Sequence, residues 1–183
     1  MAGLGPTRVF DRISDIDLRA DLLDRGLTCA LLDIDNTIRS RVDGQVPPDV
    51  RSWMAHARRA GVSLCLLSNN FHSNVPRLAA ELDIPYVYRA VKPLPFGYNR
   101  ALQLMGVPRS AAVMVGDRLG TDILGARLLG MQAYLVAPLA GQAVRTAAFE
   151  QVFGAARTEP RGALGAESEQ GSAFTRTDRA ADE

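Results

Sequence analysis

The chain has 183 residues, of which 47% are hydrophobic, and its formal net charge at pH 7 is +1. This length suits one domain with a full core, and the near-neutral charge gives no general attraction to nucleic acid or to an anionic membrane. No apolar run is long enough to span a bilayer, and the first residues lack the basic and apolar regions of a secretory signal. We therefore expect a cytoplasmic protein without a nucleic-acid partner.

In chain order, apolar runs of strand length alternate with amphipathic segments of helical length. The expected strands cover residues 28–32, 62–67, 86–88, 112–115 and 133–136. The expected helices cover residues 17–25, 49–60, 74–82, 94–105 and 121–129. This alternation predicts an α/β fold in three layers, with a doubly wound parallel sheet between helices.

After Pro138 the pattern weakens. Residues 144–153 have the spacing of one last amphipathic helix, whereas residues 154–183 are rich in Gly, Ala, Glu, Ser and Arg and have little to bury. We therefore expect a single domain over residues 1–153 and a disordered tail over residues 154–183.

Three side chains inside the expected elements are assigned to the core. Trp53 lies on the apolar face of the helix over 49–60. Cys29 and Cys65 lie inside strands, where small buried hydrophobes of a reducing cytosol are a better explanation than a disulfide or a metal site.

A pair of carboxylates follows the first strand directly, in the segment Asp33-Ile34-Asp35-Asn36-Thr37. In extended backbone the side chains at positions i and i+2 point to the same side, so Asp33 and Asp35 face one small space. Two anions held this close need a cation or a shared proton. The pair suits a divalent metal, with one carboxylate as nucleophile and the other as proton carrier.

Three further polar clusters follow in order. Ser68-Asn69-Asn70 ends the strand over 62–67, Lys92 is the only lysine of the chain, and Gly116-Asp117 with Asp122 follows the strand over 112–115. Avoidance of lysine elsewhere suggests that position 92 needs a compact ammonium. Each cluster alone could be a turn or a helix cap. Together they predict one site, because the carboxyl ends of parallel strands share one edge of a sheet.

The ordered set Asp33-x-Asp35-x-Thr37, Ser68, Lys92 and Gly116-Asp117-x-x-x-x-Asp122 resembles the four motifs of the haloacid dehalogenase-like phosphatases. Four segments of the chain resemble, more narrowly, the YqeG-type class IIIA branch, which is similar to the phosphatidylglycerophosphatases: DIDNT, LLSNN, VKP and GDRLGTDILGA. The likeness extends from about Val9 to Val136 and implies a Rossmann-like sheet.

The resemblance implies that Asp33 attacks the phosphorus of a phosphomonoester and that Asp35 serves as general acid and then as general base. It also implies a magnesium ion bound by the side chains of Asp33 and Asp117 and by the backbone carbonyl of Asp35. Asp122 would bind this ion directly or through water.

The same resemblance implies a set of phosphate-binding residues, which are Thr37, Ser68, Asn69 and Lys92. In this set Lys92 would neutralise charge on Asp33 and on the transferring phosphoryl group. Thr37 would orient the loop of the first motif and bond near the phosphate.

The spacing of the motifs leaves no room for a large cap domain, either between Thr37 and Val62 or between Asn70 and Lys92. The site should therefore be open. An open site favours a large substrate, such as a lipid headgroup at a membrane, a protein or a nucleic-acid end, unless a second subunit closes it.

Some local features favour a lipid. Four arginines flank the motifs, and one or two of them could bind the second phosphate of a phosphatidylglycerophosphate headgroup: Arg39, Arg41, Arg89 and Arg118. Solvated surface charge is the alternative for each. Val9, Phe10 and Ile13 could touch the inner face of the membrane, although core packing is favoured for them.

Three hypotheses about function follow. The first is a magnesium-dependent phosphatase of phosphatidylglycerophosphate. The second is a phosphatase of small soluble phosphate esters or nucleotides. The third is a binding module that keeps the fold without turnover, which the presence of Asp33, Asp35, Lys92 and Asp117 together disfavours.

Overall fold

The computed structural model describes residues 3–70 and 74–139 of the chain. Its centre is a six-stranded sheet in which all paired strands are parallel, in the order β1-β6-β5-β2-β3-β4. The strands are β1 (Arg8–Phe10), β2 (Cys29–Leu32), β3 (Ser63–Leu67), β4 (Tyr86–Val87), β5 (Ala112–Gly116) and β6 (Gln132–Val136). The expected doubly wound parallel sheet is therefore confirmed.

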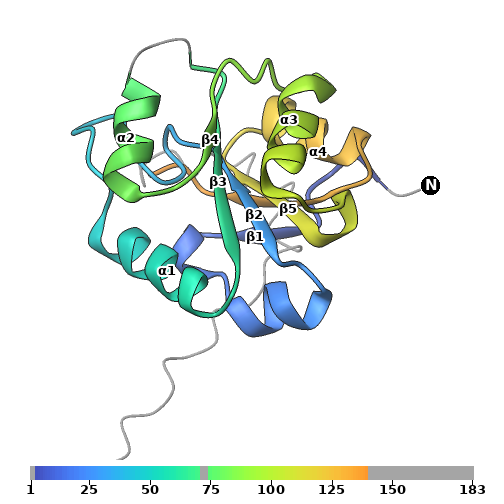
Figure 1. The fold of residues 1–183 in the computed structure, drawn as a ribbon, viewed down its shortest axis with the longest axis horizontal. Helices are drawn as coiled ribbons and strands as arrows, with labels where there is room; N and C mark the ends of the chain where they lie inside the picture. The colour runs from blue at the N-terminus through green and yellow to red at the C-terminus, as the bar shows by residue number, and fades with distance from the viewer. Residues whose placement is uncertain (1–2, 71–73, 140–183) are drawn as a thin grey trace, which may run out of the picture.

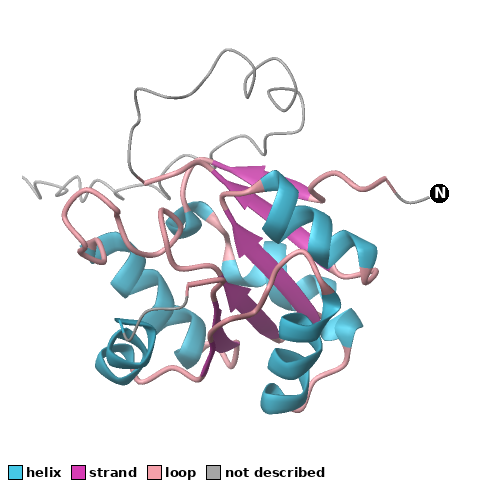
Figure 2. Cartoon of the chain, turned by 90° about the horizontal axis from the view of Figure 1, so that it is seen from above, coloured by secondary structure: helices cyan, strands magenta, loops and turns pink. Residues whose placement is uncertain are grey.

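Helices cover both faces of this sheet. They are α1 (Pro48–Arg59), α2 (Asn74–Leu82), α3 (Pro95–Met105) and α4 (Leu124–Leu128). Figure 1 shows α1 and α2 on one side of the strands and α3 and α4 on the other, and Figure 2 shows the strands between these two groups. Short helical turns complete the described chain at Ile13–Asp15, Leu18–Leu22, Leu23–Arg25, Arg109–Ala111 and Leu119–Ile123.

The alternation of side chains along each strand divides the core into two parts. Ala30 and Leu32 of β2 pack with the α1 and α2 side, whereas Cys29 and Leu31 pack with the α3 and α4 side. A strand buried on both faces must be apolar at every position, which is why β2 reads as a continuous apolar run. Trp53 is 5% exposed in the first part, as expected.

The cysteines behave as the sequence suggests. Cys29 and Cys65 are both buried and free. Burial raises the pKa of the Cys65 thiol to about 12, so this side chain acts as a small hydrophobe.

The N-terminal segment differs from the expected elements. Strand β1 was not expected, because three residues beside polar neighbours give too short an apolar pattern. It pairs with β6 and places Val9 and Phe10 at 0% and 4% exposure, while Ile13 is 0% exposed. These three side chains belong to the core, so the favoured core packing is confirmed and they are not available to touch a membrane.

Two expected helices are shorter or looser than the sequence indicates. Residues 17–25 form a π-type turn and a 3-10 turn rather than one α-helix. The helix expected over 121–129 begins instead with a π-type turn at Leu119–Ile123 and becomes α-helical only at Leu124. Such turns place side chains where a regular helix would not, and the second one positions Asp122.

No cap domain is seen in residues 3–70 and 74–139. Within the same residues, no helix is both long and apolar enough to cross a bilayer. The helix expected over 144–153 and the tail expected over 154–183 lie outside the described residues.

Candidate active site

Strands are added to the sheet first on one side of β2 and then on the other, so the strand order reverses at the centre of the sheet. From β2 the chain adds β3 and β4 on one side, and it then crosses back to add β5 and β6 on the other. Because β2 and β5 are hydrogen-bonded neighbours, the loops after them diverge from a common edge. Open α/β sheets bind their ligands in the crevice at such a point.

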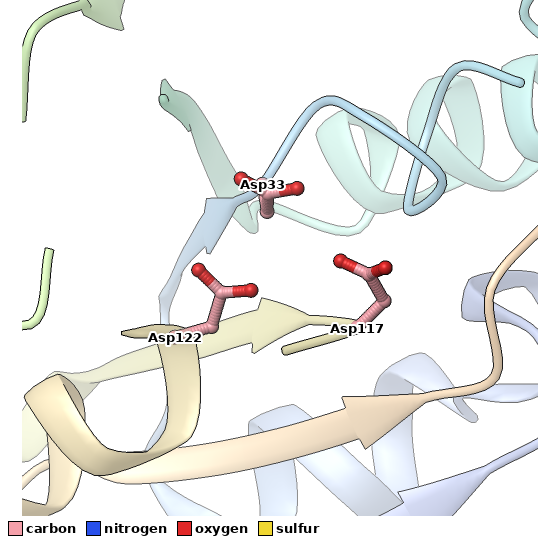
Figure 3. Close-up of side chains that lie close together, drawn as sticks. All are labelled: Asp33, Asp117 and Asp122. Carbon is pink, nitrogen blue, oxygen red and sulfur yellow. The ribbon is translucent and has the colours of Figure 1, made fainter. Parts of the chain in front are cut away.

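Three carboxylates meet at this crevice. Asp33 follows β2, Asp117 follows β5 and Asp122 lies in the turn after it, and one oxygen from each lies within 4.8 Å of the others (Figure 3). Asp122 is fully buried and Asp33 is 8% exposed. Asp117 Oδ1 is buried without a hydrogen-bond partner among the described residues. Oxygen donors at this spacing, one of them unsatisfied, fit a hard divalent cation such as magnesium.

Lys92 reaches this carboxylate group from the segment before α3. Its Nζ lies 2.6 Å from Asp33 Oδ1 and 2.7 Å from Asp122 Oδ1, and it also donates to the Leu67 carbonyl oxygen at 2.7 Å. The residue is 5% exposed. Burial lowers the pKa of Lys92, but the charges of Asp33 and Asp122 outweigh this effect and raise the pKa above its ordinary value. The single lysine is therefore a buried ammonium.

The acidic groups respond to the same burial in the opposite sense. Burial, only partly offset by Lys92, raises the pKa of Asp33 to about 6. Burial and the charge of Asp33 raise the pKa of Asp117 to about 7. One ammonium does not neutralise three carboxylates, so the group has a demand for further positive charge.

We expect magnesium chloride to raise the thermal unfolding midpoint more at pH 8 than at pH 5. The pKa values of Asp33 and Asp117 rise from 3.8 to about 6 and about 7, so without a cation their contribution to stability is full below about pH 4. It is lost as the pH rises through 6 and 7, and a cation bound to the ionised carboxylates offsets that loss. At pH 8 and a saturating magnesium concentration, we expect the free energy of unfolding to increase by about 2–3 kcal/mol. Sodium chloride of equal ionic strength is the control, and equal magnesium shifts at both pH values would contradict the prediction.

Asn69 holds the backbone on which Lys92 is carried. Its Nδ2 donates to the Lys92 carbonyl oxygen at 2.9 Å, and the Lys92 backbone N–H donates to its Oδ1 at 2.6 Å. Val91, just before this pair, has a φ of 55°, which is rare for a β-branched residue. The Asn69 amide therefore positions Lys92, while its contact with phosphate stays a prediction.

Ser68 lies between Asn69 and the end of β3. Its hydroxyl oxygen accepts from the Asn70 backbone N–H at 3.0 Å, and the residue is 3% exposed. Ser68 lines the cleft, and its contact with a phosphoryl oxygen stays a prediction.

Asp35 lies at the edge of the site rather than in the carboxylate group. Arg39 Nη2 is 2.8 Å from Asp35 Oδ1, and Arg41 Nη2 is 3.4 Å from Asp35 Oδ2. Asp33 and Asp35 both line the cleft, but Asp35 is not part of the carboxylate group, and metal binding by its backbone carbonyl stays a prediction. Thr37 is 1% exposed, does not line the cleft, and has a buried Oγ1 without a partner among the described residues, and its contact near the phosphate stays a prediction.

An open cleft of about 360 Å³ lies over this site, and Asp117, Asp122 and Thr37 are not among the residues that line it. Its lining residues are Asp33, Asp35, Arg41, Ser68, Asn69, Asn70, Lys92, Arg118 and Thr121. The cleft therefore combines acidic groups, one ammonium, hydrogen-bond donors and two arginines, which is a set suited to a phosphorylated ligand.

Tyr98 is a site residue that sequence reasoning did not identify. It is fully buried in α3, and its hydroxyl lies 2.9 Å from the Thr121 carbonyl oxygen and 3.0 Å from that of Asp122. It thus supports the turn that carries Asp122. A tyrosine on the apolar face of a helix gives no signal of this contact, because the partner is a backbone segment more than 20 residues away.

Gly116 leaves the space that the Asp122 carboxylate occupies. A Cβ at this position would lie 2.5 Å from Asp122 Cγ and would also meet its Oδ2. We expect Gly116→Ala to displace this carboxylate and to lower turnover about 100-fold. Gly120→Ala is the matched control, because its Cβ meets nothing within 4 Å in the same loop, and steady-state kinetics should show less than about a twofold change. Equal activity of both variants would contradict this account of Gly116.

Comparisons with known proteins identify the family of the chain. The family model of the haloacid dehalogenase-like hydrolases matches residues 2–130. The chain is 31% identical to a probable phosphatase, YqeG, of Bacillus subtilis over 65% of this chain and 69% of that protein. It is 32% identical to a phosphoserine phosphatase of Thermus thermophilus over 49% of this chain but only 39% of that protein.

Solved structures give a further comparison. A cobalt-bound deoxy-D-mannose-octulosonate 8-phosphate phosphatase of Haemophilus influenzae aligns over 61% of this chain and 69% of its own, with 11% identity and a TM-score of 0.49. A hydrolase of Streptomyces avermitilis aligns over 66% of this chain and 72% of its own, with 19% identity and a TM-score of 0.49. On its sequence match, the chain belongs to the haloacid dehalogenase-like hydrolases and is a phosphatase that acts on phosphoric monoesters.

Proposed function

We propose that the protein is a magnesium-dependent phosphomonoester hydrolase that works through an aspartyl-phosphate, with phosphatidylglycerophosphate as its substrate. The observation that carries the chemistry is the placement of Lys92 between Asp33 and Asp122 beside the unsatisfied Asp117 oxygen. A buried ammonium and a cation site around one carboxylate are what a nucleophile facing a phosphate dianion requires.

In the first step a carboxylate oxygen of Asp33 attacks phosphorus and the bond from phosphorus to the leaving oxygen breaks. Asp35 gives its proton to that oxygen, so the leaving group departs as an alcohol. Lys92 and the Ser68 hydroxyl bind phosphoryl oxygens and offset the charge that develops on them.

In the second step water attacks the phosphorus of the aspartyl-phosphate. Asp35 takes a proton from this water, inorganic phosphate leaves and the Asp33 carboxylate is regenerated. Arg39 and Arg41 contact Asp35 and hold its side chain at the cleft edge as a carboxylate, the form that accepts the proton from water. The proton gained in this step is the one that Asp35 gives to the leaving oxygen of the next substrate.

Magnesium would be held by the side chains of Asp33 and Asp117 and by the backbone carbonyl of Asp35, and Asp122 would bind it directly or through water. When bound, it would neutralise phosphoryl charge and help to align the phosphorus with Asp33. Carboxylate and carbonyl oxygens favour a hard divalent cation. Measuring turnover with magnesium and with manganese would show which of the two the enzyme uses.

The proposed substrate is a phosphorylated lipid headgroup that carries a second phosphate. Arg41 and Arg118 line the cleft, which makes them the candidates to bind that group. Arg41 also pairs with Asp35 at 3.4 Å, whereas Arg39 and Arg89 are not among the residues that line the cleft, and Arg89 lies over the Tyr88 ring at 5.4 Å. The open cleft supports a substrate held at the inner face of a membrane by a cytoplasmic enzyme.

Small soluble phosphate esters are the second candidate. This alternative is favoured by the name of the Thermus thermophilus relative, a phosphoserine phosphatase, although the match spans a minor part of that protein. An open cleft also accepts small esters.

Assays of one protein preparation on several substrates distinguish a lipid substrate from small soluble esters. We expect phosphate release from phosphatidylglycerophosphate in detergent micelles with a higher kcat/KM than from phosphoserine or p-nitrophenyl phosphate, and none after chelation of magnesium. Hydrolysis of the soluble esters without hydrolysis of the lipid would reject the lipid substrate and leave the phosphatase chemistry in place.

The acid role of Asp35 has its own test. Asp35→Asn should slow the release of poor leaving groups such as alkyl alcohols by about 100-fold or more, and that of p-nitrophenol much less, because a good leaving group needs little protonation. The ratio of the two rates is the measurement. Equal slowing for both esters would argue against an acid at this position.

A further inference from the structure

Large exposed hydrophobic side chains are unevenly distributed over the described part of the chain. Eight are exposed there, and five of them come from segments at the cleft edge of the sheet: Val42 (82%), Val91 (47%), Leu94 (48%), Phe96 (71%) and Leu119 (42%). We call these five the apolar rim. The other three are Leu4, Leu104 and Leu128.

Topology places the rim on the same edge as the site. Val42 lies in the loop after β2, Leu119 follows β5, and Val91 and Leu94 lie between β4 and α3. Phe96 is in the first turn of α3, which returns from that edge, and Figure 1 shows the segment between β4 and α3 at the top of the view. Leu104 and Leu128 lie at the C-terminal ends of α3 and α4, and Leu4 precedes β1. All three therefore lie at the edge of the sheet where the strands begin, which we call the far edge.

Positive charge accompanies the rim. Arg41, Arg89 and Arg118 are exposed in segments 33–47, 88–94 and 117–119, and Asp43 is the exposed carboxylate of these segments. Arg41 and Arg118 also line the cleft and are the sequence neighbours of Val42 and Leu119, so the rim and the cleft share these two cationic groups.

We propose that the apolar rim docks the cleft onto an anionic lipid bilayer, a proposal that rests on the proposed function and gives that site its partner. The five side chains come from three segments at the cleft edge, at residue 42, residues 91–96 and residue 119, and each segment has an exposed arginine in it or within two residues of it. A bilayer interface accepts this pattern, because apolar tips enter the acyl boundary while arginines stay at the level of lipid phosphates. In this orientation Lys92 and Asp33 face the headgroup layer.

The test is sedimentation of the full chain with vesicles, measured without turnover. We expect binding to vesicles of phosphatidylcholine mixed with phosphatidylglycerol, weaker binding to phosphatidylcholine alone, and a decline with rising sodium chloride. The double variant Leu94→Ser, Phe96→Ser should bind about tenfold more weakly or worse, since two apolar side chains then no longer enter the bilayer. The matched control is Leu104→Ser, Leu128→Ser, which removes two equally exposed leucines from the far edge and should bind as the parent does.

Each other outcome overturns the proposal. Failure of the parent chain to bind either vesicle would do so and would favour a soluble or protein-borne phosphate. Equal weakening of both double variants would do so as well, because it would show that position on the molecule is irrelevant. Since p-nitrophenyl phosphate hydrolysis by the same preparation reports the chemistry separately, failure of docking and failure of the phosphatase mechanism are distinguishable.

Discussion

Replacing Asp33 by asparagine is expected to reduce turnover by at least about 10⁴-fold while the fold is kept, because an amide cannot form the phosphorylated intermediate. Lys92 would keep its pair with Asp122 at 2.7 Å, so the buried ammonium is not left alone. Brief mixing with a phosphate-labelled ester should leave label on the parent protein and none on Asp33→Asn.

The control for this variant is Asp43→Asn, an exposed residue of the same loop that does not line the cleft. It should change kcat/KM by less than about twofold. Circular dichroism of both variants should match that of the parent. Near-normal turnover or retained label in Asp33→Asn would identify another residue as the nucleophile.

Replacing Lys92 by methionine is expected to have the largest combined effect on stability and activity. The side chain is 1% exposed and pairs with two buried carboxylates, so its removal leaves buried charge uncompensated and costs about 3–5 kcal/mol in the free energy of unfolding. Turnover should fall by about 10³-fold, because the phosphoryl charge and Asp33 lose their cation. Denaturant unfolding without magnesium measures the first effect and steady-state kinetics the second.

A second substitution keeps this prediction testable where Lys92→Met folds poorly. Asp122→Asn removes one of the two stranded carboxylates, so it should restore part of the lost stability in the Lys92→Met background while destabilising the parent. This reversal of sign is the signature of a buried charge pair. Additive losses in the two backgrounds would contradict the proposed coupling of Lys92 and Asp122.

Much of the fold could be predicted from the sequence, because long apolar runs and helical periodicity are local signals. The strand containing Leu31 and the helix containing Trp53 are of this kind, and both are confirmed within a residue or two of their expected bounds. Strand β1 could not be predicted in the same way, because its three residues form a strand only through their pairing with β6, which is distant in the sequence. The π-type turn that carries Asp122 likewise depends on tertiary contacts, among them the two carbonyl contacts of the Tyr98 hydroxyl.

The candidate site shows the same division. The sequence indicates which residue types follow each strand, and the shared edge of a parallel sheet then brings Asp33 and Asp117 together. It does not indicate that Lys92 pairs with Asp122 as well as Asp33, or that Asn69 holds the Lys92 backbone. These contacts join loops far apart in the chain, and no periodic pattern encodes them.

The burial of Lys92 has a practical consequence for chemical labelling. Because this is the one lysine in the sequence and its side chain is 1% exposed, the folded protein presents no accessible ε-amine to acylating reagents. Apart from the α-amino group, an amine-directed dye or cross-linker would find its target only after the domain opens. Acylation of Lys92 would therefore report unfolding of the domain. Lysine-directed immobilisation or acetylation would leave Lys92 unmodified in the folded protein.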